Sequence, residues 1–389
     1  MRRPENGGDS KPRRYAELVA RSTRDTVGRL REPRAAIPRD DGIDAGVRWL
    51  CLTHDVTGRR GCSKGYSLLR GWFPAFPETT GYIIGTLLAH AERTNDSSYR
   101  QRAIEMGDWE VEVQCADGGV MEGLLTGEPK PSTVFNTGMV MHGWVDLHEA
   151  SPDARRLEAA VRAGEFLLKH QHPDGAWRGE AEYFGIPHTY CARVSWALIR
   201  LATATGNDAY REAARRQLDW VLGRQQENGW FDACNFKPGR DPNTHGIAYT
   251  LRGLLESAVL LEHDPYLAAA RRTSEALIDR FEASGRRLPA TFDSAWRPTA
   301  RYECLTGNAQ LGGVWLRLFE LTGERRFREA GLGAVERAAG RQVRSSWAAI
   351  DGALAGSDPI YGRYAPLQFP NWATKFLVDS LVLRERVIS

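Results

Sequence analysis

The sequence predicts an all-α fold in which six helical hairpins close into a single (α/α)6 toroid. Three observations support this prediction: a turn pattern that recurs about every 57 residues, two unlike helices within each period, and an unpaired helix at each end of the repeating part. Together they describe one closed domain, although 389 residues would otherwise allow two or three.

The recurring turn begins with glutamine and reaches a glycine four residues later. It reads Gln-Cys-Ala-Asp-Gly at 114–118, Gln-His-Pro-Asp-Gly at 171–175 and Gln-Gln-Glu-Asn-Gly at 225–229. A large apolar residue stands five positions before each glutamine; the same register extends to His54 and Glu282 and fades near Gln342. The six markers are 60, 57, 54, 57 and 60 residues apart, which leaves room for two helices and their connections.

Each period contains one charged amphipathic helix, expected on the outside, and one that is apolar nearly all round, expected inside. The segments 154–171 and 209–225 are examples of the outer kind. The inner kind comprises 79–91, 136–148, 190–202, 245–261 and 305–321. The first outer segment, 44–55, and the last inner segment, 371–383, lack a partner next to them in sequence, so we expect them to pair and close the ring. A linear solenoid, the alternative, would need polar caps at both ends.

Residues 1–43 differ from the repeats and are predicted to form a basic, partly disordered extension, which leaves 44–389 as the toroid domain. They hold eleven Arg and Lys against seven Asp and Glu, with four prolines and few large apolar side chains. A solvated extension is the simplest interpretation, and a membrane-surface or partner-binding arm is the alternative.

The composition excludes several classes of function. A net charge of +3 gives no strong field for nucleic acid, and the absence of any run of 18 apolar residues predicts no transmembrane segment. The first residues lack the apolar stretch of a secretory signal, and the six cysteines contain no Cys-x-x-Cys pair. We therefore expect a cytoplasmic protein with reduced thiols, of undetermined oligomeric state.

The connections between helices are asymmetric. Links from an inner to an outer helix are short, whereas those from an outer to an inner helix are long: 58–78, 118–135, 175–188, 229–244, 283–303 and 343–370. Long loops in a compact domain usually carry function, and these open where the inner helices begin. Converging helix N-termini favour an anionic group such as a carboxylate or phosphate. This mouth of the toroid is therefore the predicted site.

Polar and aromatic side chains accumulate at the predicted mouth, and tryptophan and tyrosine beside carboxylates and amides suit sugar rings. His245, Tyr249 and Arg252 follow one stripe of an inner helix. The candidate catalytic residues are His245, Tyr249, Glu78, Arg193 and Asp293. The candidate substrate-binding residues are Trp72, Asn136, Trp177, Tyr190, Trp230, Asp232, Arg252, Asn308, Tyr361, Asn371, Trp372 and Lys375.

Several of these candidates also have a purely structural interpretation. Arg252 with Glu256, and Lys375 with Asp379, have the spacing of ion pairs within one helix. Glu78 could cap the helix that follows Pro77, or be a mouth carboxylate whose pKa is lowered by the helix dipole.

No metal or cofactor is predicted. Asp232, Cys234 and His245 could in principle bind zinc, but their spacing matches no strong signature. The sequence has no Gly-x-Ser-x-Gly, Walker or His-Glu-x-x-His motif.

The turn Gln171-x3-Gly175-x-Trp177 resembles the repeat of squalene-cyclase-like toroids, and Asp-Gly-Gly at 117–119 resembles prenyltransferase β subunits. The Asp-x-Asp-Asp motif that such a cyclase would need does not occur. More specifically, the strings at 77–84, 135–138, 227–231, 244–256, 304–310, 356–364 and 370–376 resemble a toroid family of bacterial exopolysaccharide gene clusters, the polysaccharide biosynthesis proteins. The resemblance implies a fold near six-hairpin glycosidases and a carbohydrate context in the cytoplasm, without a settled reaction.

Three functions remain open at this point. The first is an enzyme acting on an anionic saccharide or sugar-lipid. As a lyase or C5-epimerase, it would use Arg193 or Arg252 with Asn136 to neutralise a uronate and His245 or Tyr249 as base. As a hydrolase, it would use two carboxylates among Glu78, Asp232 and Asp293. The second is a non-catalytic glycan-binding assembly protein, and the third a prenyl or terpenoid cyclase-like toroid.

Overall fold

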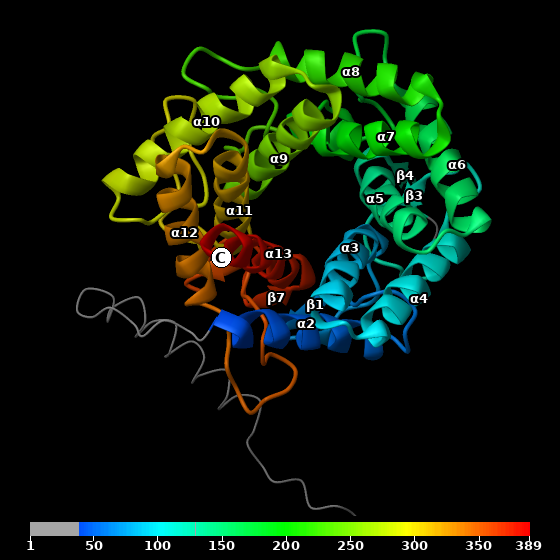
Figure 1. The fold of residues 1–389 in the computed structure, drawn as a ribbon, viewed down its shortest axis with the longest axis horizontal. Coiled ribbons are helices and arrows are strands. Elements are labelled where there is room, and N and C mark those ends of the chain that lie inside the picture. Colours follow the sequence, from blue (N-terminus) through cyan, green and yellow to red (C-terminus); the bar gives the residue numbers. More distant parts are fainter. Residues whose placement is uncertain (1–38, 129) are drawn as a thin grey trace, which may run out of the picture.

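The computed structural model describes residues 39–389 apart from residue 129, and it confirms an all-α toroid. An outer ring of helices surrounds an inner ring (Figure 1). The outer helices are α2 (Arg39–Asp55), α4 (Ser97–Val113), α6 (Ala154–His170), α8 (Asp208–Leu222), α10 (Asp264–Ala283) and α12 (Arg325–Ala339). The inner helices are α3 (Pro77–Thr94), α5 (Val134–Ala150), α7 (Ala192–Thr205), α9 (Thr244–Leu261), α11 (Leu305–Thr322) and α13 (Asn371–Ile388).

The ring closes as the sequence predicts, because α2 packs on α13 and α13 also contacts α3. The linear solenoid is thereby excluded. The first outer helix begins at Arg39, five residues earlier than the predicted segment. The remainder of the predicted extension, 1–38, lies outside the described residues. None of the helices in the described part is long and apolar enough to cross a membrane.

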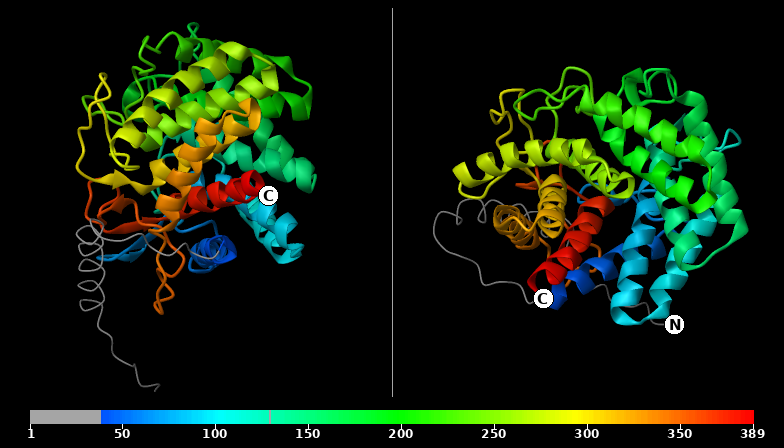
Figure 2. Two further views of the ribbon diagram at one scale, coloured as in Figure 1. Left: turned by 60° about the vertical axis from the view of Figure 1, so that its left-hand side comes forward. Right: turned by 45° about the horizontal axis from the view of Figure 1, so that its top comes forward.

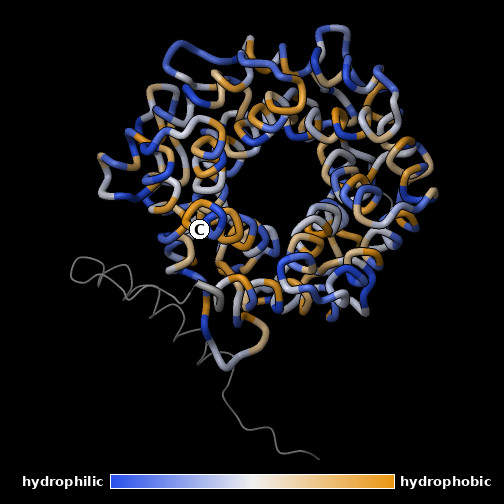
Figure 3. The backbone as a smooth tube through the Cα atoms, viewed as in Figure 1, coloured by the Kyte–Doolittle hydropathy of each residue, from blue (hydrophilic) through white to orange (hydrophobic). Residues whose placement is uncertain are grey.

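Inner helices pack closely where glycine removes a side chain. A Cβ atom on Gly253 of α9 would collide with the backbone of Ala192, where α7 begins. A Cβ on Gly143 of α5 would likewise meet the carbonyl oxygen of Gly81 in α3. The outer helices, by contrast, alternate between hydrophilic and hydrophobic turns in Figure 3. The two helix types therefore differ in packing as well as in composition.

The recurring glutamine has a structural purpose that explains the repeat. Gln171 Nε2 donates to the carbonyl oxygens of Gly175, 3.0 Å away in its own turn, and Ala213, 2.8 Å away in the next outer helix. Gln114 does the same with Gly118 and Ala159. Gln342, where the sequence pattern fades, still bonds Gly352 and Gly42, and so joins the last turn to α2. Each glutamine therefore fastens one hairpin to its neighbour.

The long links between helices gather at one end of the toroid (Figure 2), and they contain short strands. β1 (Gly65–Ser67) pairs antiparallel with β2 (Gly71–Trp72) and β7 (Gln368–Pro370). β3 (Val120–Met121) pairs with β4 (Ser132–Thr133), and β5 (Glu303–Cys304) with β6 (Ser357–Asp358). The first sheet joins the first and last long loops, so the loops of the mouth are held to one another.

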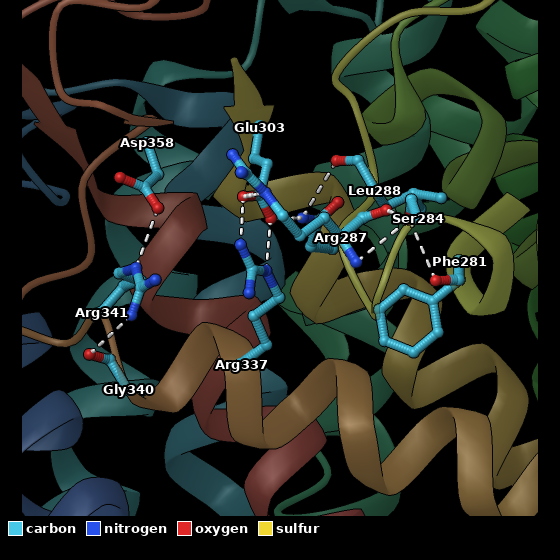
Figure 4. Close-up of polar contacts among 10 residues, drawn as sticks. Phe281, Ser284, Arg287, Leu288, Glu303, Arg337, Gly340, Arg341 and Asp358 are labelled. Carbon is cyan, nitrogen blue, oxygen red and sulfur yellow. Dashed lines mark hydrogen bonds and ion pairs between the residues drawn. The ribbon is translucent and has the colours of Figure 1, made fainter. Parts of the chain in front are cut away.

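Ion pairs fix the β5–β6 hairpin to the outer ring (Figure 4). Glu303 is buried and accepts from Arg337 Nε at 2.6 Å and from Arg287 Nε at 3.3 Å. On the partner strand, Asp358 accepts from Arg341 Nε at 2.8 Å. These buried carboxylates are paired with arginine, and they support the loops rather than line the cavity that the loops surround.

Candidate active site

A cavity of about 260 Å³ lies at the N-terminal ends of the inner helices, where the sequence predicts the mouth. Its walls are mostly aromatic. The lining residues are Phe76, Glu78, Phe135, Tyr183, Phe184, Tyr190, Phe236, His245, Tyr249, Tyr364 and Trp372. We call this space the mouth cavity. Aromatic faces with a few polar groups between them are typical of a site that binds a small ring.

Glu78 is the carboxyl group of the mouth cavity. It is half-buried at the second position of α3, and among the described residues no donor hydrogen-bonds or ion-pairs with it. Removal from water raises its pKa to about 8, against the smaller opposing effects of Lys64 and Arg193. The expectation of a lowered pKa is therefore wrong: desolvation by the aromatic walls outweighs the helix dipole, and Glu78 is mostly protonated at pH 7.

The capping interpretation of Glu78 also fails. The residue at the N-cap position of α3 is Phe76, which makes no side-chain capping bond. The hydroxyls of Thr79 and Thr80 donate back to the carbonyl oxygen of Phe76 instead of accepting from the helix amides. Glu78 is thus an acid in an aromatic cavity, without an ion-pair or hydrogen-bond partner among the described residues, and such groups concentrate at functional sites.

His245 is buried in the wall of the mouth cavity and belongs to the first turn of α9. Its Nδ1 lies 2.5 Å from Gln310 Oε1. An amide oxygen only accepts, so the proton of the neutral ring lies on Nδ1, and Nε2 keeps a lone pair. Burial lowers the pKa of His245 to about 3, so the imidazole is neutral at pH 7 and a weak base.

Tyr249 lines the mouth cavity, and Arg193 lies against its ring on the side of a second cavity. The Tyr249 ring centroid is 4.3 Å from that of His245, and its buried hydroxyl has no hydrogen-bond partner. The Arg193 guanidinium carbon is 5.2 Å from the centre of the Tyr249 ring and 5.4 Å from that of Phe376. Burial raises the pKa of Tyr249, so its hydroxyl stays protonated and can donate. This aromatic layer around Arg193 separates the mouth cavity from the space beyond.

Lys64 provides a cation near the mouth that sequence reasoning did not identify. Its ammonium lies 5.8 Å from the centre of the Trp372 ring and 5.1 Å from that of Phe73. Burial lowers the pKa of Lys64, and the Glu78 carboxyl acts in the opposite direction. A cation stacked beside an aromatic wall can bind a carboxylate on a sugar ring that occupies that wall.

The mouth cavity brings together five of the predicted residues: Glu78, Tyr190, His245, Tyr249 and Trp372. Arg193, Arg252 and Lys375 line a second cavity, on the other side of the aromatic layer. Arg252 pairs there with Glu256 at 2.8 Å, and Lys375 with Asp379. The ion pairs expected from the spacing are thus present, and these two cations do not line the mouth cavity.

Three predicted asparagines stand outside the cavity lining and hold the loops. Asn136 Nδ2 donates to the Met121 carbonyl at 2.8 Å, and its oxygen accepts from the Tyr183 hydroxyl at 3.0 Å. Asn371 donates to Ser63 and Thr79. Asn308 donates to Glu303 at 3.2 Å. Asn136 therefore positions Tyr183 in the wall, and its amide nitrogen is already used within the protein.

The remaining predicted residues also lie outside the lining. The indoles of Trp177 and Trp230 are buried in the core, with Trp177 Nε1 donating to Leu167. Trp72 packs on Tyr66, and Tyr361 is 53% exposed. The acids Asp232 and Asp293 bind Gln226 and Arg297 in their own loops. These residues lie outside the cavity lining for one reason: their aromatic rings and carboxylates make the packing contacts and hydrogen bonds that hold the loops in place.

Sequence reasoning missed most of the cavity's apolar wall, which includes Phe76, Phe135, Phe184 and Phe236. The available signal was position: Phe76 and Phe135 come directly before or at the start of inner helices. A search for polar groups passed over them. Within the described residues, no cluster of three or more His, Cys, Asp or Glu could hold a metal ion.

Comparison with solved structures identifies the fold. The unsaturated glucuronyl hydrolase of Bacillus sp. GL1 superimposes with a TM-score of 0.68 at 16% identity, over 90% of this chain and 97% of that one. A heparin-specific unsaturated glucuronyl hydrolase gives 0.71 at 12% identity, with the same coverage. A D-mannose isomerase gives 0.69 at 11% identity, over 88% and 97%. No family model and no curated protein matches the chain.

These likenesses show that the fold is the (α/α)6 toroid that is also found in six-hairpin glycosidase-like enzymes. The part of the sequence resemblance that concerns the fold is therefore confirmed. Membership of the exopolysaccharide-cluster family stays a prediction.

Proposed function

We propose that the protein is a carbohydrate-active enzyme that transfers a proton to or from a carbon of an anionic saccharide in the mouth cavity. The observation that carries this proposal is that a protonated Glu78, which has no ion-pair partner among the described residues, and a neutral His245 line the same aromatic cavity. A group with a pKa of about 8 can both donate and accept a proton near neutral pH.

Each wall of the cavity has a distinct task in this proposal. Tyr190 and Trp372 provide faces for the apolar side of a sugar ring. His245 accepts a hydrogen bond from a sugar hydroxyl through Nε2, while Gln310 holds the ring through Nδ1. Lys64 binds the saccharide's carboxylate near Trp372. The expected role of His245 as the base passes to Glu78, because an imidazole with a pKa of about 3 accepts protons poorly at pH 7.

Hydrolysis by two carboxylates receives less support. That mechanism needs an acid and a second carboxylate on opposite sides of the glycosidic bond. Glu78 is the sole carboxyl group among the residues that line the mouth cavity, and the other two candidates, Asp232 and Asp293, bind side chains of their own loops. One carboxyl group suffices, by contrast, to protonate an unsaturated uronide or to remove the proton beside a uronate carboxylate.

The solved structures of similar fold support a saccharide as substrate. Their names describe enzymes acting on unsaturated glucuronyl groups and on D-mannose. An unsaturated uronide and a saturated uronate both carry the carboxylate that Lys64 would bind. A sugar-lipid substrate and a cytoplasmic biosynthetic setting remain predictions from the sequence.

The test is solvent deuterium incorporation, followed by NMR, with saturated and unsaturated uronate disaccharides in D₂O. Proton transfer predicts a new carbon–deuterium bond in the product or in recovered substrate. Glu78→Gln should lose this activity by at least about 100-fold, whereas Glu92→Gln, an exposed acid on the same helix, should keep it. Turnover without carbon-bound deuterium would overturn the chemistry, and binding without any turnover would favour the glycan-binding protein.

A further inference from the structure

A second, larger cavity lies on the opposite side of the aromatic layer, within the ring of inner helices. Its volume is about 650 Å³, and all six inner helices contribute to its lining. We call it the basal cavity. The mouth cavity and the function proposed for it do not use this space.

The basal cavity is rich in positive charge. Its six cationic side chains are Arg193, Arg200, Arg252, Arg317, Lys375 and Arg386, against three carboxylates, those of Asp146, Glu256 and Asp379. Arg200 pairs with Asp146 at 2.6 Å, and Arg317 with Glu320 at 3.0 Å. Arg252 and Lys375 pair with Glu256 and Asp379 in the same way, so the surplus of positive charge centres on Arg193.

Arg193 is the clearest part of that surplus. It is 5% exposed, and its Nε donates to the Met139 sulfur at 3.2 Å. No carboxylate among the described residues forms an ion pair with it. Arg252 and Lys375 lie nearby. In addition to burial, the charge of Arg252 lowers the pKa of Arg193, and the charge of Arg193 lowers the pKa of Lys375. A buried guanidinium without an anionic partner is costly, so its donors need another acceptor.

Helix dipoles do not account for these cations. The C-terminal ends of inner helices carry partial negative charge, which stabilises cations in the last turn. Arg193, however, is the second residue of α7, and Lys375 the fifth residue of α13. Arg252 stands in the middle of α9. At the first two positions the dipole opposes a positive charge, so the cluster needs a different explanation.

We propose that the basal cavity binds a small molecule carrying a phosphate group, held by Arg193, Arg252 and Lys375. An arginine guanidinium can donate two parallel hydrogen bonds to two oxygens of one phosphate, and the lysine ammonium adds a positive charge. The Trp196 ring centre lies 5.6 Å from the guanidinium carbon of Arg193 and 5.7 Å from that of Arg252, so an aromatic ring lines the cavity beside both arginines. The carboxylates there are already occupied within the protein: Asp379 accepts from Thr86 and Lys375, and Asp146 accepts from Arg200. Glu256 pairs with Arg252 and with Arg317.

Isothermal titration calorimetry at constant ionic strength tests this proposal, with inorganic phosphate, glycerol 3-phosphate and acetate as probes. The two phosphates should bind, and acetate should bind at least tenfold more weakly. Arg252→Gln should weaken phosphate binding at least tenfold, and Arg252→Lys should restore part of it. Lys375→Met provides a second variant should the first fail to fold. Arg326→Gln, an exposed arginine of the outer ring paired with Asp279, is the matched control.

The basal cavity can be tested separately from the mouth. Glu78→Gln should retain phosphate affinity while losing activity on saccharides. Failure of the proposed saccharide chemistry would thus leave the phosphate result untouched. Phosphate affinity that is unchanged in both Arg252→Gln and Lys375→Met, equal binding of acetate, or no binding of phosphate at all would overturn the inference.

Discussion

Replacing Glu78 with glutamine should stabilise the protein while it removes activity. The folded state raises the pKa of Glu78 from 4.5 to about 8, so between these values the folded chain holds a proton that the unfolded chain has released. The contribution of Glu78 to the free energy of unfolding therefore falls as pH rises through this range. The loss is about 1.4 kcal/mol per pH unit, which gives about 3 kcal/mol at pH 7. Glutamine, neutral in both states, avoids this cost.

The predicted gain is specific in its dependence on pH. At pH 7 the variant should gain about 3 kcal/mol, or about 4 °C in Tm for a chain of this size, and near pH 4.5 the gain should vanish. Urea unfolding at pH 5 and pH 8 measures the difference, with Glu92→Gln as the exposed control on the same helix. An equal effect at both pH values, or a loss of stability, would refute the idea that the mouth cavity desolvates this carboxyl group.

Three further predictions follow. His245 has a folded pKa of about 3 against 6.5, so its contribution to the free energy of unfolding should rise by about 3 kcal/mol from pH 4 to 6.5, and urea titrations of His245→Gln should lack this rise relative to the parent protein. Gly352→Ala should lower Tm and cost more than about 2 kcal/mol in denaturant, because φ is +84° and a Cβ would strike the Ala45 carbonyl. Arg337→Met should cost about 3 kcal/mol by the same measurement, since Glu303 is buried against it.

The fold could be predicted from the sequence because its repeat has a local cause. Each glutamine fastens its own turn to the next outer helix, so Gln171 and its counterparts recur at the spacing of a hairpin. The turn glycine is equally constrained: Gly175 has φ of +91° and lies against the backbone of Arg216. Such contacts recur at Gln114, Gln171, Gln225 and Gln342 and therefore leave a periodic trace. Gln342 keeps the contact although the surrounding pattern has faded.

The site could be predicted only in part, because it depends on which side of an inner helix faces the lumen and at what depth. Helical spacing placed His245, Tyr249 and Arg252 on one stripe, but the stripe runs through the aromatic layer, so its ends enter different cavities. The pKa of Glu78 could not be read from its place near a helix start, since the aromatic rings that line the cavity around it come from loops and helices far apart in the sequence. Asp293 shows the opposite error: the sequence predicts it to be catalytic, but its carboxylate accepts from the backbone amides of Ala295 and Arg297 in its own turn.

The central claim is that a saccharide binds in the mouth cavity with its reacting carbon beside the carboxyl group of Glu78. The most direct measurement is a crystal structure of the Glu78→Gln variant with a uronate disaccharide. The account predicts a sugar ring between the aromatic walls of the mouth cavity, with its carboxylate toward Lys64 and a hydroxyl within hydrogen-bonding distance of His245 Nε2. A saccharide bound in the basal cavity, or on the outer surface with the mouth cavity left empty, would contradict it.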